Sequence, residues 1–306
     1  MKPKTSIFIP TKNAGEDFHK ILQQISIQKE KNFELIIVDS GSTDNTLKIA
    51  EQFKEKFPIK IYEIKPEEFG HGKTRNLSIE YAKGEFIVFL TQDAIPYNDF
   101  WLSSLLENFK DSKVAGVFSK QVPRKNAREI EKFQLNYYFP NKKITISNNE
   151  KNLLNKMFFS NASSCVRKNV LIKYPFNEEL IMTEDQEWAK RIIQRGYKKV
   201  YEPESIVIHS HNYNSKQTFQ RYFDSAVSLN QILKIDFKKY VSSAKKYPIK
   251  ELRYTFKKNV LLVPRVIFEN IIKVTATKLG KNHQKLPLSL KKTFSMHKYY
   301  WINRNF

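Results

Sequence analysis

Short apolar runs alternate with amphipathic stretches along the first 90 residues. The apolar runs are too short for helices and predict strands at 6–10, 33–38, 59–64 and 85–90. Between them, apolar side chains at helical spacing predict helices at 18–25, 44–57 and 73–83. This alternation with short connections predicts an α/β fold: a mostly parallel sheet flanked by helices, with ligands bound beyond the carboxyl ends of the strands.

Polar loops follow three of these predicted strands, at 10–13, 39–44 and 91–96. In a parallel sheet such loops converge at one edge. A carboxylate at this edge can accept a hydrogen bond from a pyrimidine, or it can coordinate a divalent cation, which prefers oxygen ligands. The alternative is that Asp39 and Ser42 only cap a turn and the next helix. The loops therefore predict a ligand site, with the capping interpretation left open.

The chain is strongly basic, and its charge is unevenly placed. It carries 53 Lys+Arg and 31 Asp+Glu in 306 residues, a formal net charge of +22. Residues 234–306 hold 18 Lys+Arg and 3 Asp+Glu, a net of +15, which leaves 35 against 28, or +7, for residues 1–233. A surplus of this size indicates an anionic partner. The single cysteine, Cys165, excludes an internal disulfide.

The basic region 234–306 also carries apolar residues at near-helical spacing. They are Leu252, Phe256, Val260, Leu261, Val263, Ile267 and Ile271. The pattern predicts basic amphipathic helices, which either lie on an anionic membrane surface or pack onto the body with their lysines in water. Pro264 and Arg265 interrupt the longest apolar stretch, so we expect no membrane-spanning helix, which needs about 20 apolar residues. The chain does not start like a signal peptide, and we expect a cytoplasmic protein that is peripheral at the inner face of the cell membrane.

Four motifs follow one another in order along the chain: Pro10–Asn13, Val38–Asp44, Phe89–Pro96 and Thr183–Glu187. Together they resemble the signature of family 2 glycosyltransferases, enzymes of the GT-A fold. Further segments resemble bacterial rhamnosyltransferases: Phe69–Asn76, His209–Tyr213, Arg221–Asp224, Leu279–His283 and Ser295–Trp301. The resemblance implies an inverting transfer of L-rhamnose from dTDP-rhamnose onto a surface polysaccharide or its lipid-linked precursor. A UDP-sugar donor is the alternative.

The resemblance also implies a domain organisation. A GT-A domain would cover 1–233, with a nucleotide-binding half of about 1–120 and an acceptor-binding half of about 121–233. The basic helical region 234–306 would follow it. We make no prediction of the oligomeric state.

Roles in the acceptor half follow from the Thr-Glu-Asp motif. The resemblance implies that Asp185, at the start of a helix predicted at 184–195, is the general base, and that Glu184 contacts the acceptor. The alternative is that both acids merely favour the first turn of that helix. Trp188 lies one turn later and either stacks on an acceptor sugar or is buried on an amphipathic helix.

The expected cation site departs from the family pattern. Family members usually present Asp-X-Asp after the fourth strand, whereas this chain has Thr91, Gln92 and Asp93. The resemblance implies that Asp93 binds Mg²⁺ or Mn²⁺, which bridges the two phosphates of the donor. A histidine completes the ligand set in related enzymes. His209 is expected in this role, with His211 as its rival and a structural role for either histidine as the alternative.

The resemblance places the nucleotide-sugar donor against the first half of the chain. The implied contacts are Pro10, Thr11, Asp39, Ser40, Lys73, Arg75 and Gln92. Asp39 would meet the pyrimidine edge, and Ser40 stands where a second aspartate is common in the family. Lys73 and Arg75 follow two glycines that allow a ligand to approach closely, so we expect them at the base or diphosphate. A solvated helix face is the alternative for this pair.

Two other functions would also explain parts of the sequence. A nucleic-acid-binding protein would account for the charge, but the chain has no recognisable nucleic-acid motif, and acidic loops at the ligand edge would repel phosphates. We therefore expect no nucleic-acid partner. An inactive, membrane-associated scaffold would account for the missing first acid of Asp-X-Asp.

Overall fold

The predicted alternation of strands and helices is present in the computed structural model of the chain, which describes residues 3–233, 237 and 246–302. The strands are β1 (Thr5–Thr11), β2 (Phe33–Asp39), β3 (Ile59–Glu63), β4 (Phe86–Leu90), β5 (Ile95–Pro96), β6 (Val114–Val122), β7 (Ile144–Ile146), β8 (Ser163–Arg167) and β9 (Lys198–Ile208). They form one sheet in the order β3-β2-β1-β4-β8-β6-β9-β5, and β7 pairs with β9. One sheet flanked by helices agrees with the α/β fold class expected from the sequence.

The sheet is mixed. Strands β1 to β4 are parallel to one another, as predicted, and β6 is parallel to β9. Strand β8 lies between β4 and β6 and runs antiparallel to both. In the parallel half the register pairs Thr11 with Asp39, so the ends of β1 and β2 bring two of the polar loops together.

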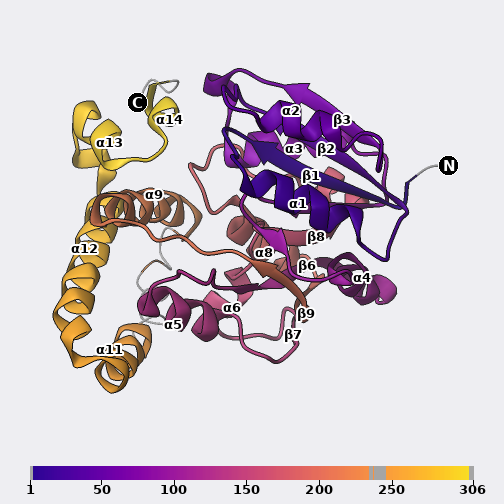
Figure 1. The fold of residues 1–306 in the computed structure, drawn as a ribbon. Helices are drawn as coiled ribbons and strands as arrows, with labels where there is room; N and C mark the ends of the chain where they lie inside the picture. Colours follow the sequence, from indigo (N-terminus) through magenta and orange to yellow (C-terminus); the bar gives the residue numbers. More distant parts are fainter. Residues whose placement is uncertain (1–2, 234–236, 238–245, 303–306) are drawn as a thin grey trace.

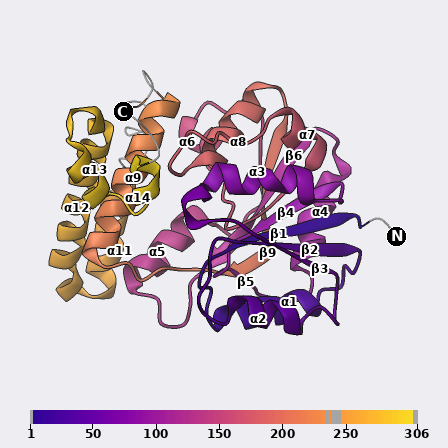
Figure 2. The same ribbon diagram turned by 90° about the horizontal axis from the view of Figure 1, so that it is seen from above.

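Helices cover both faces of the sheet (Figures 1 and 2). In the body they are α1 (Asp17–Ser26), α2 (Thr46–Gln52), α3 (His71–Tyr81), α4 (Trp101–Leu106), α5 (Glu129–Tyr138), α6 (Leu153–Met157), α7 (Lys168–Lys173) and α8 (Glu184–Gln194), with single 3-10 turns η1 (Pro66–Glu68) and η2 (Glu107–Lys110). Alternate side chains of each strand point to opposite faces. Ile7 and Ile9 of β1 therefore pack with α1 and α4, whereas Phe8 packs with the α7 and α8 side.

Helix α2 is shorter than its sequence pattern predicts. Residues 44–57 were expected to be helical, but the helix covers Thr46–Gln52. Asp44 lies outside it, because its carboxylate accepts hydrogen bonds from the Thr46 N–H (2.9 Å) and hydroxyl (2.5 Å). At the other end the chain turns towards Pro58, and the residue before a proline disfavours the helical conformation.

The C-terminal part is helical, as predicted. It comprises α9 (Ser215–Leu233), α11 (Lys246–Lys258), η4 (Val260–Leu262), α12 (Val263–Lys281), η5 (His283–Lys285), α13 (Leu288–Phe294) and α14 (Lys298–Ile302). Residues 234–236, 238–245 and 303–306 of the predicted basic region lie outside the described residues. Helix α12 packs along α9, and a Cβ at Gly280 would overlap the carbonyl group of Phe223, so only glycine allows this close approach. No helix in the described part of the chain is both long and apolar enough to span a bilayer.

Candidate active site

The loops after β1 and β2 are joined by the side chain of Asp39. This fully buried carboxylate accepts hydrogen bonds from the Thr11 hydroxyl (2.9 Å), the Gly41 N–H (3.0 Å) and both the N–H (2.7 Å) and hydroxyl (2.6 Å) of Ser42. The Ser40 N–H donates to the Thr11 carbonyl (2.9 Å). Both oxygens of Asp39 therefore shape the loop.

The loop after β4 is tied to the loop after β1 and to the strand that follows it in the sheet. The side chain of Gln92 makes two reciprocal bonds with the backbone of Lys12, at 2.6 and 3.0 Å. The Thr91 N–H donates to the Ala162 carbonyl (3.1 Å), just before β8. The Arg124 guanidinium donates to the Asp93 carbonyl (2.8 Å) and to the Asp17 carboxylate (2.6 Å). These bonds fix Asp93 at the end of the loop.

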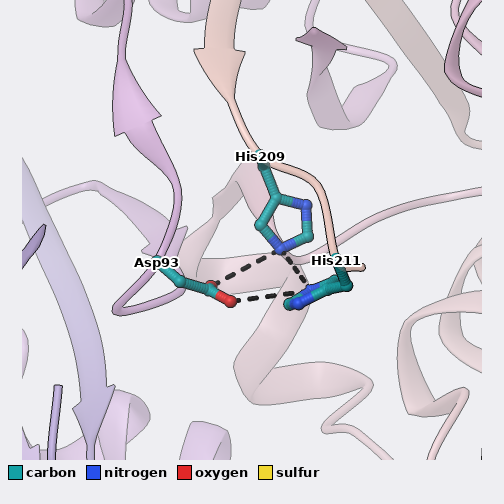
Figure 3. Close-up of side chains that lie close together, drawn as sticks. All are labelled: Asp93, His209 and His211. Atoms are coloured by element: carbon teal, nitrogen blue, oxygen red, sulfur yellow. Dashed lines mark hydrogen bonds and ion pairs between the residues drawn. The ribbon is translucent and has the colours of Figure 1, made fainter. Parts of the chain in front are cut away.

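Three potential metal ligands meet beyond the ends of β4 and β9. The Nε2 atoms of His209 and His211 each lie 3.5 Å from one oxygen of Asp93, and they lie 3.0 Å from each other. Figure 3 shows that the three side chains point toward one common centre. All three are partly buried, and their ligand atoms lie within 4.8 Å of one another. One carboxylate and two imidazoles at this spacing fit a divalent cation.

The surroundings prepare this cluster to bind a cation. Burial opposes ionisation of Asp93, but hydrogen bonding and charge from His209 and His211 hold the pKa of Asp93 below its ordinary value. Burial, followed by His209, lowers the pKa of His211 to about 4, so this imidazole is neutral at physiological pH. Nδ1 of His209 lies 2.8 Å from the Gln121 side-chain carbonyl, and the Gln121 amide donates to the Ser160 hydroxyl. The contact with Gln121 orients the His209 ring so that its Nε2 points toward Asp93.

A second group of charges forms at the N-terminus of α8. The Arg75 guanidinium donates to the Glu184 carboxylate at 2.6 Å, with both side chains at most 6% exposed. Asp185 accepts hydrogen bonds from the Asn161 N–H (3.1 Å) and the Gln186 N–H (2.8 Å). Burial, together with the neighbouring Glu184 carboxylate, raises the pKa of Asp185 to about 7. A carboxylate with such a pKa is suited to accept a proton near neutral pH.

The backbone before α8 is strained. Thr183 has φ 64°, in the left-handed region that non-glycine residues rarely adopt. Its hydroxyl oxygen is buried and has no hydrogen-bond partner among the described residues. Strain of this kind gathers at functional sites, where the surrounding structure holds a side chain in a fixed direction. Here it sets where Glu184 and Asp185 leave the backbone.

The C-terminal helices reach this second group through a histidine. His297, between α13 and α14, packs edge-on against His71 at the start of α3, with ring centroids 4.9 Å apart. Nδ1 of His71 in turn lies 3.4 Å from Nη1 of Arg75. Asp224 of α9 holds the segment in place, because its carboxylate accepts from the Met296 N–H at 2.8 Å.

Comparison with known proteins identifies the family of this site. Residues 6–177, more than half of the chain, match the model of glycosyl transferase family 2. The chain is 35% identical over 306 residues to the O-antigen chain rhamnosyltransferase RfbN of Salmonella typhimurium, covering 98% of this chain and 96% of RfbN. It is 37% identical to the O-antigen chain rhamnosyltransferase WbaN of Salmonella anatum, with the same coverage. The chain belongs to glycosyltransferase family 2.

Solved structures agree on the fold of this glycosyltransferase. Staphylococcus aureus TarS (residues 1–349) superposes with a TM-score of 0.58 at 18% identity, covering 92% of this chain and 91% of that one. The mannosyltransferase PcManGT from Pyrobaculum calidifontis, solved with GDP-Man and Mn²⁺, gives a TM-score of 0.60 at 17% identity and covers 99% of this chain and 86% of its own. The family match and the similarity to RfbN and WbaN confirm the predicted enzyme class, and the solved structures confirm the GT-A fold.

Two predicted contacts of the glycosyltransferase are placed differently from what we expected. Trp188 is fully buried between Phe159 and Phe176, and its indole N–H donates to the Tyr174 carbonyl, so no face is free for an acceptor sugar. Trp188 is therefore buried on an amphipathic helix, which was the alternative given for it. Arg75 was expected at the base or diphosphate, but its guanidinium is engaged by Glu184.

The other donor-side predictions stay open. Lys73 is exposed at the start of α3, and the loops of Pro10, Thr11 and Gln92 are bonded to one another, but contact of these residues with the nucleotide stays a prediction. Asp39 and Ser40 lie together at the expected edge, yet contact with a pyrimidine requires Asp39 to exchange one of its present bonds.

Three polar residues of the site were missed by the sequence analysis. Gln121 lies near the end of β6, a strand that was not predicted from the sequence, and Arg124 follows it. Asn161 lies in the segment of small and polar residues before β8, next to Ser160 and close to Ser163. Each of the three acts through a partner at least 24 residues away, so spacing along the sequence does not reveal it.

Proposed function

We propose that this glycosyltransferase moves L-rhamnose from dTDP-rhamnose onto a surface polysaccharide such as O-antigen, or onto its lipid-linked precursor, with inversion at the anomeric carbon. The observation that carries the proposal is the pairing of two sites in one fold. A cluster of Asp93, His209 and His211 suits the cation of a nucleotide diphosphate, and Asp185 is a carboxylate suited to take a proton. The nearly full-length similarity to RfbN and WbaN supports rhamnose as the sugar.

The proposed reaction assigns a task to each group. The acceptor hydroxyl gives its proton to Asp185 while its oxygen forms the new bond to the anomeric carbon. The bond between that carbon and the phosphate oxygen breaks on the opposite face, and the nucleotide diphosphate leaves with the electron pair. When bound to Asp93, His209 and His211, Mg²⁺ or Mn²⁺ would neutralise charge on the departing diphosphate.

The other side chains would orient these groups. The Asn161 N–H holds one oxygen of Asp185, so the free lone pair of the carboxylate has a fixed direction. Glu184 would contact the acceptor while Arg75 compensates its charge. Pro10, Thr11, Asp39, Ser40, Lys73 and Gln92 would surround the nucleotide. The protein would act in the cytoplasm, at the inner face of the membrane where a lipid-linked acceptor is found.

A donor screen tests the proposal. Thermal shift with dTDP and UDP, each with and without Mn²⁺ or Mg²⁺, measures which base and cation stabilise the protein. Transfer from dTDP-rhamnose to a lipid-linked acceptor is then followed by mass spectrometry, and NMR of the product gives the anomeric configuration. We expect cation-dependent stabilisation by dTDP and an inverted product. Stabilisation by UDP alone, or a retained configuration, would contradict the donor or the mechanism respectively.

A further inference from the structure

Helix α12 is turned with its apolar side outward. The residues that it buries include Glu269 and Lys273, 7% and 9% exposed. The exposed side carries Ile267, Phe268, Ile271 and Val274, which are 47%, 55%, 58% and 69% exposed. Positions 267, 271 and 274 form one stripe along the helix. A helix on a water-soluble surface normally has the opposite arrangement, so the stripe requires an explanation.

Ion pairs and hydrogen bonds fix this orientation. Glu269 accepts from Arg128, which precedes α5, at 2.9 Å and from Arg265 at 3.2 Å. The fully buried carboxylate of Glu251 in α11 accepts from Asn270 at 2.8 Å and from Lys273 at 3.4 Å. Rotating α12 to bury its apolar stripe would separate Glu269 and Lys273 from these partners and leave buried charges unpaired. The apolar stripe is therefore held outward by the rest of the fold.

The stripe continues over the corner between α11 and α12. Phe256, Val260 and Leu261 are 67%, 55% and 82% exposed there. An open groove runs between the two helices, lined by Leu252, Arg253, Phe256, Lys257, Val263 and Ile267. We call the seven exposed side chains the apolar face: Phe256, Val260, Leu261, Ile267, Phe268, Ile271 and Val274. In both views α12 lies at the edge of the molecule, with α9 between it and the body (Figures 1 and 2).

Charge decides which occupant fits the apolar face. Exposed cations lie on the same two helices: Arg253, Lys257, Lys258, Arg265 and Lys278. The region 234–306 has a net charge of +15, so a second copy of the chain would bring a like charge against it. An anionic lipid surface supplies the opposite charge around the rim and an apolar layer beneath it. Single exposed apolar residues are normal on a soluble surface, whereas a continuous apolar face of this kind indicates an interaction site.

We propose that the apolar face enters the headgroup and acyl boundary of an anionic bilayer, with the surrounding lysines and arginines on the phosphates. No helix crosses the bilayer in this arrangement; α11 and α12 lie along its surface. The benefit to catalysis rests on the proposed function, because docking would place the enzyme beside a lipid-linked acceptor.

Vesicle binding of the full-length protein tests this assignment. We expect co-sedimentation with vesicles of phosphatidylcholine and phosphatidylglycerol, weak binding to phosphatidylcholine alone, and release by salt. The double variant Ile271→Ser/Val274→Ser should bind the anionic vesicles about tenfold more weakly or worse, since apolar area buried in the interface is lost. Ile172→Ser is the matched control, because Ile172 is 55% exposed on α7 in the body. It should bind like the unmodified protein.

Charge and oligomeric state provide two further readouts. Lys257→Gln/Lys258→Gln should weaken binding to anionic vesicles and reduce its salt dependence, whereas Lys48→Gln on α2 should not. Absence of binding to anionic vesicles, or equal loss in Ile172→Ser, would overturn the proposal. So would a dimer in analytical ultracentrifugation that Ile271→Ser/Val274→Ser converts to a monomer, because a second copy would then occupy the face.

The same preparations separate this proposal from the proposed function. Stabilisation by dTDP with Mn²⁺ is measured on each variant in the absence of lipid. Vesicle binding without nucleotide binding would support the membrane proposal and contradict the donor assignment. Nucleotide binding without vesicle binding would support the donor assignment and contradict the membrane proposal.

Discussion

The buried ion pair between Arg75 and Glu184 allows a quantitative prediction for Arg75→Met. The two side chains are 6% and 4% exposed, and the N–O distance is 2.6 Å. Methionine fills much of the space but leaves the Glu184 carboxylate buried without its cation. Removing one partner of a buried pair typically costs about 3–5 kcal/mol. We expect the free energy of unfolding, measured in urea, to fall by that amount.

A control for this variant exists on the same helix. Arg191 and Glu187 form an i,i+4 pair at 2.9 Å in α8, with side chains 28% and 16% exposed. Because water screens this pair more strongly, Arg191→Met should cost only about 0.5 kcal/mol from the ion pair. The double variant Arg75→Met/Glu184→Gln should be more stable than the sum of its single changes implies, by about 2 kcal/mol.

Activity provides an independent check, because the pair also acts on Asp185. The Arg75 charge lowers the pKa of Asp185, and the Glu184 charge raises it. The acid limb of the rate–pH profile should therefore move to higher pH in Arg75→Met and to lower pH in Glu184→Gln. Additive stabilities in the double variant, or a loss in Arg75→Met no larger than in Arg191→Met, would refute the reasoning.

Three further predictions concern the base, the cation and a buried lysine. Asp185→Asn should keep nucleotide binding and reduce transfer by about 10²- to 10⁴-fold. In the unmodified enzyme the rate should fall as pH drops below about 7. Because the folded pKa of Asp185 is raised, the contribution of this group to the unfolding free energy, measured in urea as the difference between the unmodified protein and Asp185→Asn, should decrease as pH rises from about 4 to 7. Calorimetry of dTDP binding should show tighter binding with Mn²⁺ than with Mg²⁺, because two of the three ligand atoms are imidazole nitrogens. Lys199→Met should cost about 2–4 kcal/mol in urea unfolding, since the carbonyls of residues 156 and 158 lose their donor, whereas Lys198→Met, at a partly exposed pair, should cost under about 1 kcal/mol.

The sequence was a good guide wherever local periodicity decides the structure. Strands β1, β2 and β4 have apolar residues on both faces, as buried parallel strands require, and the polar loops after them do meet at one edge. Asp93 follows the end of β4, whereas the two histidines follow β9, in the second half of the chain. The resemblance to a known family added the fold of the second half, where β8 runs antiparallel between two strands that the pattern did not connect.

Long-range partners could not be predicted from the pattern. Arg75 and Glu184 are 109 residues apart, and either residue alone fits a ligand contact as well as an ion pair. The same limit applies to α12. Its spacing predicts an amphipathic helix, but the side that packs is decided by Arg128, 141 residues from Glu269. Hydrophobicity alone would have buried Ile271 and exposed Lys273, the reverse of what the fold does.

The segment 160–162 connects the candidate base to the candidate cation site. The Ser160 hydroxyl accepts from Gln121, which orients His209. The next residue, Asn161, donates its N–H to Asp185, and the carbonyl of Ala162 accepts from the Thr91 N–H at the start of the loop that carries Asp93. Asp185 is thus bonded directly to this segment just before β8, whereas His209 and the loop that carries Asp93 are connected to it through Gln121 and Thr91. In the proposed reaction the acceptor oxygen attacks the anomeric carbon while the diphosphate leaves from the opposite face, which requires a fixed separation between the candidate base and the candidate cation site. A short backbone segment with few rotatable bonds between its contacts would supply this separation.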